Sequence, residues 1–266
     1  MSLRFVDLNV PIQEPLPGEL NGGMGAILAA SIEYQSHEET RPEFGMMFGG
    51  ATEKDMPGGF AIGAEKLQLT AHAGTHVDAP WHYYPTSEGK PARTIDQLEL
   101  EHFFAPGVVV DLRGHAPGDR IEVDELAAAV QRTGAPLAPG DIVCLWFGHD
   151  ERFGTRDYWD DYPGLGAEAT RWLIGQGIKV IGTDAPGLDR GNPYMARDFQ
   201  ETGDASLLWE AHRVGIDHEY FQIEKLANLG ELPARGFYVA CFPVKIKGAS
   251  AGWCRAVAIF GLEVAA

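Results

Sequence analysis

The pattern of hydrophobic and polar residues along the chain changes repeatedly between a period of two and a helical period. Some segments alternate apolar and polar residues as half-buried strands do, others are short apolar runs typical of buried strands, and longer ones have a helical spacing. The predicted strands cover residues 5–10, 66–71, 108–110, 142–147, 180–182, 236–242 and 256–262, and the predicted helices cover residues 123–132, 167–176 and 206–214. Strands separated by helices predict an α/β fold whose sheet has parallel members.

The composition predicts a single domain spanning residues 1–266. Because 45% of the 266 residues are hydrophobic, the chain can bury a full core, and no Ser/Gly-rich linker or charge block divides it. The 38 acidic residues exceed the 21 basic ones, which gives a formal net charge of −17. A chain this acidic repels phosphate backbones, so we expect no nucleic acid among its partners.

Three features of the sequence bear on the location of the protein and on the redox state of its cysteines. No window of the sequence approaches a membrane span of about 20 apolar residues, and the first residues lack the apolar core of a signal peptide. We therefore expect a cytoplasmic protein with no membrane partner. Three cysteines, Cys144, Cys241 and Cys254, are odd in number and lack CxxC spacing, which predicts reduced core residues rather than disulfides.

The candidate chemistry is concentrated between residues 72 and 82, which read His-Ala-Gly-Thr-His-Val-Asp-Ala-Pro-Trp-His. Pro80 disfavours a helix, so we predict an extended segment that Gly74 bends toward closure. In an extended chain every second side chain lies on the same side. The side chains that share this side are those of His72, His76, Asp78 and His82. A polar strand with surface histidines is the alternative, but an Asp in phase with the histidines favours a metal site.

This eleven-residue string closely resembles the His-x-Gly-Thr-His-x-Asp-x-Pro-x-His signature of the metal-dependent cyclase-family hydrolases, which include bacterial kynurenine formamidase and isatin hydrolase. Downstream, His212 and Glu224 are twelve residues apart and resemble the second metal-binding segment of that family. Taken without the resemblance, they are read as a helix-face histidine and a solvated charge. The resemblance implies a single-domain, three-layer β/β/α fold of the swivelling type with a mixed sheet.

The resemblance also implies a ligand set. His72 and His76 would hold one metal, His212 would hold the other, and Asp78 and Glu224 would bridge both. Imidazole and carboxylate ligands suit Zn²⁺ or Mn²⁺, and two divalent ions about 3.5–4 Å apart need anionic bridges to offset their repulsion. We therefore expect two zinc ions, with manganese as the alternative.

His82 resembles the catalytic histidine of the family and would not bind metal. A metal lowers the pKa of its bound water toward about 7, which supplies hydroxide to attack a carbonyl. An imidazole can then act as general acid and base at neutral pH. The alternative role for His82 is a supporting histidine that is hydrogen-bonded to the backbone.

The predicted activity is hydrolysis of an amide, a cyclic amide or a lactone in a small-molecule substrate, and the resemblance implies a homodimer or higher homo-oligomer. Leu16 stands where kynurenine formamidases usually carry a tryptophan that stacks on the aryl substrate, and Leu cannot stack similarly. The open alternatives are kynurenine formamidase proper, a ring-closing cyclase, and a metal-holding binding protein without turnover.

Two further groups of residues are left without a role. Asp184 and Asp189 follow the strand predicted at residues 180–182, at the strand end where ligands and supporting groups gather in α/β sheets. The aromatic and charged residues 147–162 could line a substrate pocket or form a surface loop that packs its own aromatic rings.

Overall fold

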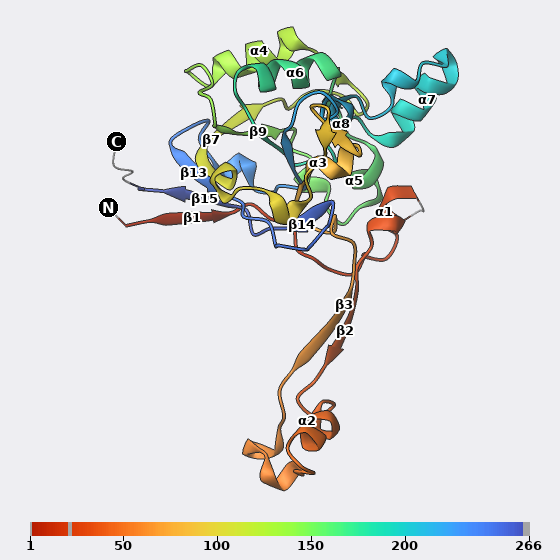
Figure 1. Ribbon diagram of the computed structural model, residues 1–266, viewed down its shortest axis with the longest axis vertical. Helices are drawn as coiled ribbons and strands as arrows, with labels where there is room; N and C mark the ends of the chain where they lie inside the picture. The colour runs from red at the N-terminus through yellow and green to blue at the C-terminus, as the bar shows by residue number, and fades with distance from the viewer. Residues whose placement is uncertain (1, 21–22, 263–266) are drawn as a thin grey trace.

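A nine-stranded mixed sheet forms the centre of the computed structural model, which describes residues 2–20 and 23–262 (Figure 1). In spatial order the strands are β1 (Arg4–Asp7), β15 (Val257–Phe260), β13 (Phe237–Ala240), β7 (Phe104–Asp111), β9 (Ile142–Trp146), β11 (Val180–Thr183), β12 (Phe221–Glu224), β4 (His76–Asp78) and β14 (Ala251–Trp253). The four strands from β7 to β12 are parallel and the others antiparallel. The prediction of an α/β fold with parallel members is confirmed.

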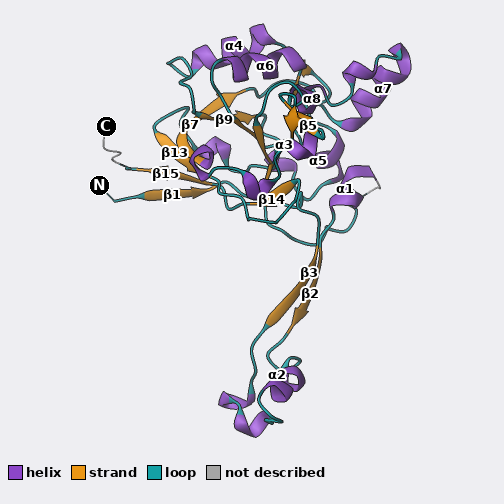
Figure 2. Ribbon diagram, in the orientation of Figure 1, coloured by secondary structure: helices purple, strands orange, loops and turns teal. Residues whose placement is uncertain are grey.

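Helices cover one face of this sheet (Figure 2), and the sheet curls so that its other face packs on itself. Val108 and Val110 of β7 point to a core shared with α4 (Val123–Arg132), α6 (Ala167–Gly175) and α8 (Glu210–Val214). Val109 points the opposite way, into a second core that includes Val6 of β1 and Val77 of β4. Strands from both ends of the order thus share one core, which gives the predicted mixed α/β layering.

The predicted elements are largely present, with one interruption. The helix predicted at residues 206–214 is broken at Trp209, whose backbone has a left-handed φ of 53°. Within the central sheet, β12 and β14 have no counterpart in the prediction, and neither does the helix α7 (Asn192–Thr202). Strand β12 carries the fully buried Gln222 and α7 buries only Met195, so neither shows a regular apolar period.

An arm made of residues 31–68 projects from the body of the molecule (Figure 1). Its shaft is the antiparallel hairpin of β2 (Ser31–Gln35) and β3 (Ala64–Gln68), and its tip contains α2 (Arg41–Met47). The strand predicted at residues 66–71 therefore belongs to the arm and not to the central sheet. Although α2 separates β2 from β3 in sequence, the two strands pair antiparallel with each other and do not join the central sheet.

The remaining elements are short and serve mainly as connections. They are α1 (Gly23–Leu28), α3 (Pro80–Tyr83), α5 (Arg156–Asp160), β5 (Thr86–Ser87), β6 (Lys90–Pro91), β8 (Arg120–Ile121) and β10 (Gly164–Leu165), with 3₁₀ turns at Glu53–Asp55, Pro57–Gly59, Ile95–Gln97, Leu100–Phe103, Asp150–Arg152, Ala205–Leu207 and Leu229–Glu231. None of the helices in the described part of the chain has the length and apolar character needed to cross a membrane. All three cysteines are free, and Cys144 and Cys241 are buried as predicted. The single domain over residues 1–266 stays a prediction.

Candidate metal centre

The histidine string is extended only over its middle, so the prediction of an extended segment from residue 72 to residue 82 was wrong at both ends. His72 lies in a turn that Gly74 closes with a φ of +61°, and the chain is extended only from His76 to Asp78 in β4. Pro80 then begins α3, because a proline in the first turn of a helix loses no hydrogen bond. The helical turn carries His82.

The register of β4 in the sheet explains why two residues far apart in the sequence are neighbours. His76 lies directly opposite Glu224 of β12, and directly opposed residues of antiparallel strands have adjacent side chains. The His76 Nε2 atom is 3.4 Å from Glu224 Oε2 and 3.2 Å from Asp78 Oδ1. Asp78 is two residues further along the strand, so it shares the same face.

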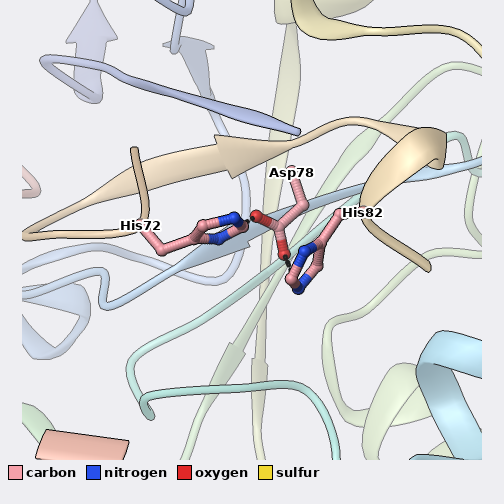
Figure 3. A group of neighbouring side chains, drawn as sticks. All are labelled: His72, Asp78 and His82. Atoms are coloured by element: carbon pink, nitrogen blue, oxygen red, sulfur yellow. Dashed lines mark ion pairs between the residues drawn. The ribbon is translucent and has the colours of Figure 1, made fainter. Parts of the chain in front are cut away.

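The carboxylate of Asp78 lies at the centre of the cluster (Figure 3). Its Oδ1 atom is 2.9 Å from His72 Nδ1, and its Oδ2 atom is 3.9 Å from both His82 Nε2 and His212 Nε2. His212, from α8, also places Nε2 3.8 Å from Glu224 Oε1. The structure thus brings together all six residues that the sequence singled out: His72, His76, Asp78, His82, His212 and Glu224.

Each of the three proposed ligand histidines has its outer ring nitrogen engaged. His76 Nδ1 donates to the carbonyl oxygen of Gly74 at 2.9 Å, and His72 Nε2 is 2.9 Å from Ser250 Oγ. His212 Nδ1 is hydrogen-bonded to the carboxylate of Asp189. These contacts orient the rings with the other nitrogen toward Asp78 and Glu224, which is the arrangement typical of metal-ligating histidines.

Two of the neighbours that support the cluster escaped the sequence-based assignment of roles. Asp189 accepts from the backbone N–H of Ala211 at 2.6 Å as well as from His212, so it fixes both the helix start and the ring. Lys225 is almost fully buried, donates to the carbonyl oxygen of His72 at 3.0 Å, and lies 3.8 Å from Glu224 Oε2. A charged residue beside Glu224 in an otherwise apolar stretch was the available signal for Lys225.

The donor set fits a divalent metal. Both carboxylate oxygens of Asp78 are buried without a hydrogen-bond partner in the described part of the chain, and a buried charge of this kind is normally paired or bound to a metal. Two groups of three residues each offer donor atoms that lie within 4.8 Å of one another, and both groups contain Asp78. The groups are His72 with Asp78 and His82, and His76 with Asp78 and Glu224.

The electrostatics of the cluster separate His82 from His212. Burial lowers the pKa of His82 to about 4, so its imidazole is neutral at pH 7. Burial also acts to lower the pKa of His212, but Asp189, followed by Glu224 and Asp78, raises it to about 9. For Asp78, burial is outweighed by the imidazoles, His82 first among them, which hold its pKa well below the usual range. At pH 7 the carboxylate of Asp78 is therefore ionised and the imidazole of His82 is neutral.

A cavity of about 680 Å³ opens over this cluster. His72, His82, His212 and Glu224 lie on its polar side, and most of the remaining wall is apolar or aromatic, including Leu28, Tyr84, Met195, Trp209 and Ile216. Tyr162 lines the cavity, whereas Tyr158 is buried and stacks on His149, so the stretch from residue 147 to residue 162 is part pocket and part self-packed loop. Leu16 does not line this cavity and instead lies beside Gly154.

Comparison with known proteins agrees with this geometry. A family model described as "Putative cyclase" matches residues 6–190. The kynurenine formamidase of Erythrobacter litoralis is 30% identical over 202 residues, which cover 76% of this chain and 79% of that protein. This chain belongs to the cyclase family.

Other members of the cyclase family point the same way. The isatin hydrolase of Roseibium aggregatum is 26% identical over 202 residues, 73% of each chain. The structure of isatin hydrolase A from Ralstonia solanacearum matches with a TM-score of 0.73 and 25% identity, over 97% of this chain and 92% of that one. The predicted family, the fold class and the prediction of a hydrolase are confirmed, and the donor set supports a metal cofactor. The individual roles of the six site residues stay predictions.

Proposed function

We propose that this cyclase-family protein hydrolyses an amide, a cyclic amide or a lactone in a small, largely apolar substrate. The observation that carries the proposal is the cluster of five metal-ligand candidates, of which His72, His212 and Glu224 line one cavity together with the neutral His82. The relatives are named for hydrolysis of a formamide and of isatin, which is consistent with cleavage of a C–N bond.

The proposed ligand set follows the family resemblance, and its five side chains lie in one cluster in the structure. His72 and His76 would hold one ion, His212 would hold a second, and Asp78 and Glu224 would bridge them. We propose Zn²⁺, with Mn²⁺ as the alternative, because imidazole and carboxylate donors suit both. When bound, such ions polarise a carbonyl group and lower the pKa of water.

His82 is proposed to move the proton. Its side chain is one-third exposed at the cavity, whereas those of His76 and Asp78 are fully buried. With a pKa lowered to about 4, its ring is neutral at pH 7 and can accept a proton from the attacking water. The carboxylate of Asp78, 3.9 Å from Nε2, would stabilise the imidazolium until the proton passes to the leaving nitrogen or oxygen.

The wall of the cavity defines the substrate class. Its volume lies within the range of about 300–1,000 Å³ that is typical of small-molecule sites. Aromatic side chains such as Trp209 and Tyr84 offer flat surfaces to a ring, and Met195 adapts to irregular shapes. An aryl amide, a fused lactam or a lactone of similar size meets these conditions.

Kynurenine formamidase proper is the second candidate. The relative from Erythrobacter litoralis favours it, and the argument against it loses its basis because Leu16 does not line the cavity. A ring-closing reaction is the reverse of ring-opening hydrolysis and would use the same residues. No contact among the described residues favours it.

The test is a turnover screen of the metal-loaded protein against aryl formamides, isatin-like lactams and lactones. We expect turnover of at least one class, with loss of activity on chelation and recovery on addition of Zn²⁺ or Mn²⁺. A kcat/KM of about 10⁴ M⁻¹s⁻¹ or more on N-formylkynurenine would assign the formamidase activity. A folded, metal-loaded protein that turns over none of the three classes would instead favour the binding protein.

A further inference from the structure

The helix α8, together with the residues at its two ends, presents one face to the cavity. The residues of this segment that line the cavity follow the spacing i, i+3, i+4 and i+7, and they are Trp209, His212, Arg213 and Ile216. This spacing brings side chains to one side of a helix. The other side carries Ala211 and Val214, which are buried in the core between the sheet and its helices. One face of α8 therefore contacts whatever occupies the cavity.

Arg213 is the charged residue on this face whose charge has no counterion. Its side chain is exposed, and its Nη1 atom donates to the carbonyl oxygen of Ala205 at 2.7 Å. Among the described residues it forms no ion pair, and the nearby Asp204 accepts the backbone N–H of Ser206 at 2.9 Å instead. The hydrogen bond to Ala205 thus holds the guanidinium in place without neutralising it.

The open edge of this guanidinium is the one through which other arginines of the chain bind carboxylates. Arg93 donates to Glu219 through Nε and Nη2 at 2.8 and 2.6 Å, and Arg113 donates to Asp111 through the same two atoms at 3.0 and 2.8 Å. In Arg213 neither Nε nor Nη2 has a hydrogen-bond partner within the described part of the chain. Two parallel N–H groups of this kind match the two oxygens of a carboxylate.

The other charged residues of the cavity wall are already engaged. Arg190 is buried and pairs with Asp198 at 2.7 Å. The acidic residues of the wall, Asp189 and Glu224, belong to the metal centre. The net charge of −17 repels an anionic molecule from the protein as a whole, so a site that accepts one needs a local cation. Arg213 supplies that cation.

We propose that Arg213 determines the specificity of this site by binding an anionic group, a carboxylate in the simplest case, that the substrate carries beside the bond to be cleaved. The inference rests on the proposed hydrolysis and narrows its substrates to compounds with one negative charge. The backbone N–H of Arg213 donates to the carbonyl oxygen of Trp209 at 2.9 Å, so Trp209, His212 and Arg213 lie within about one helical turn, roughly 6 Å along the axis. This span is comparable to one substituted benzene ring.

The test compares formanilide, a neutral aryl formamide, with its carboxylated isomers 2-, 3- and 4-formamidobenzoate as substrates of the metal-loaded protein. The readout is the selectivity, which is kcat/KM for the best carboxylated isomer divided by kcat/KM for formanilide. The variants are Arg213→Ala and Arg213→Lys, of which the second keeps the charge and loses the paired donors. The matched control is Arg156→Ala, which removes one charge from an exposed position outside the cavity.

We expect the wild type to prefer a carboxylated isomer and Arg213→Ala to lower the selectivity about 10–100-fold, mainly through KM, because charge-assisted hydrogen bonds are lost. Arg213→Lys should lose less selectivity, and Arg156→Ala should keep the wild-type value. A wild type that prefers no carboxylated isomer would overturn the proposal. An Arg213→Ala variant that slows formanilide and the carboxylated isomers alike would also overturn it, because the arginine would then only support the fold.

Binding of naphthalene-2-sulfonate, which carries the charge and cannot be hydrolysed, separates this inference from the proposed hydrolysis. Titration calorimetry should show binding that Arg213→Ala weakens at least about 10-fold and that Arg156→Ala leaves unchanged. Such binding without turnover of any substrate would keep the anion site and refute the hydrolase. Turnover of formanilide, with neither sulfonate binding nor selectivity dependent on Arg213, would refute the anion site and keep the hydrolase.

Discussion

Two aspartates of the body, Asp78 and Asp184, are both fully buried, and their surroundings are opposite. Asp184 follows β11, and its two oxygens accept the backbone N–H groups of Phe147 at 3.0 Å and His149 at 2.8 Å. Among the described residues no backbone N–H group donates to Asp78, and imidazole nitrogens surround its carboxylate. The carboxylate of Asp184 receives backbone hydrogen bonds and supports a loop. The carboxylate of Asp78 faces only imidazoles, which is an arrangement suited to binding a cation.

The pKa values follow the same division. Burial raises the pKa of Asp184 to about 7, and the imidazoles hold the pKa of Asp78 well below its usual range in spite of burial. The histidines near these two aspartates, His149 and His212, also differ in their contacts. His149 is bound through Nε2 to the carbonyl oxygen of Tyr158 at 2.8 Å, while His212 turns Nε2 toward Asp78. His149 is therefore held within its own loop, and it is not among the residues that line the cavity.

The sharpest test of this contrast is the pair Asp78→Asn and Asp184→Asn. Asp78 is proposed to bridge the metals, so its loss should remove bound metal and several kcal/mol of transition-state stabilisation, and we expect turnover to fall about 10⁴-fold in Asp78→Asn. Asp184→Asn should keep its metal and most of its turnover. Elemental analysis and steady-state kinetics measure both, with about two metal equivalents expected in the wild type. Full metal content in Asp78→Asn would contradict the ligand assignment.

A second experiment separates the metal ligands from the proton-transfer residue. His82→Ala should retain metal and fold but lose roughly 10²–10⁴-fold in turnover, the usual effect of removing a positioned acid–base group. His76→Ala and Glu224→Ala should lose metal instead. Elemental analysis and steady-state kinetics also measure these changes. If His82→Ala loses a metal equivalent, His82 is a ligand and a different proton carrier is needed.

Asp189 should have a smaller effect because it acts through His212. Asp189→Asn keeps the shape of the side chain and removes the charge that orients the imidazole, so we expect metal affinity to fall about 10–100-fold. Competition with a chelator of known affinity measures the change. Unchanged affinity together with normal folding would show that the ring is held by packing alone.

The smallest effect concerns the pH dependence of stability. The folded-state pKa of Asp184, about 7, is above its ordinary value of 3.8, so its stabilising contribution is present at low pH and is lost as the pH rises through 7. Between pH 6 and pH 8 this amounts to about 1.4 kcal/mol of unfolding free energy. The unfolding free energy measured with urea should fall more steeply between pH 6 and pH 8 for the wild type than for Asp184→Asn. Parallel curves would refute the raised pKa.

The sequence alone predicted the residues of the centre better than their surroundings. His72, His76, Asp78 and His82 were identified by their chemistry and spacing, because three histidines in phase with an aspartate are rare in a strand used only for packing. His212 and Glu224 were identified only by their resemblance to the second metal-binding segment of the family. Asp184 and Asp189 could not be distinguished, because the hydrogen bonds that separate them come from distant segments, the loop at residues 147–149 and the start of α8.

The arm shows a different limit of sequence-based prediction. The alternation at residues 66–71 correctly indicated extended chain that includes part of β3, but a period of two does not identify the strand on the other side. Pro80 was interpreted as excluding a helix, although it begins one, because a proline breaks a helix only beyond its first turn.

The pairing of β4 with β12 also has a consequence for how the chain is synthesised and folds. The hydrogen bond from Lys225 to His72 closes a loop of 153 residues, and the strands on both sides of β4 come from the last quarter of the chain. A nascent chain therefore emerges with its histidine string long before the carboxylate of Glu224 exists. Contacts so distant in sequence delay folding, so the site should acquire its full metal affinity only in the final, slow folding phase.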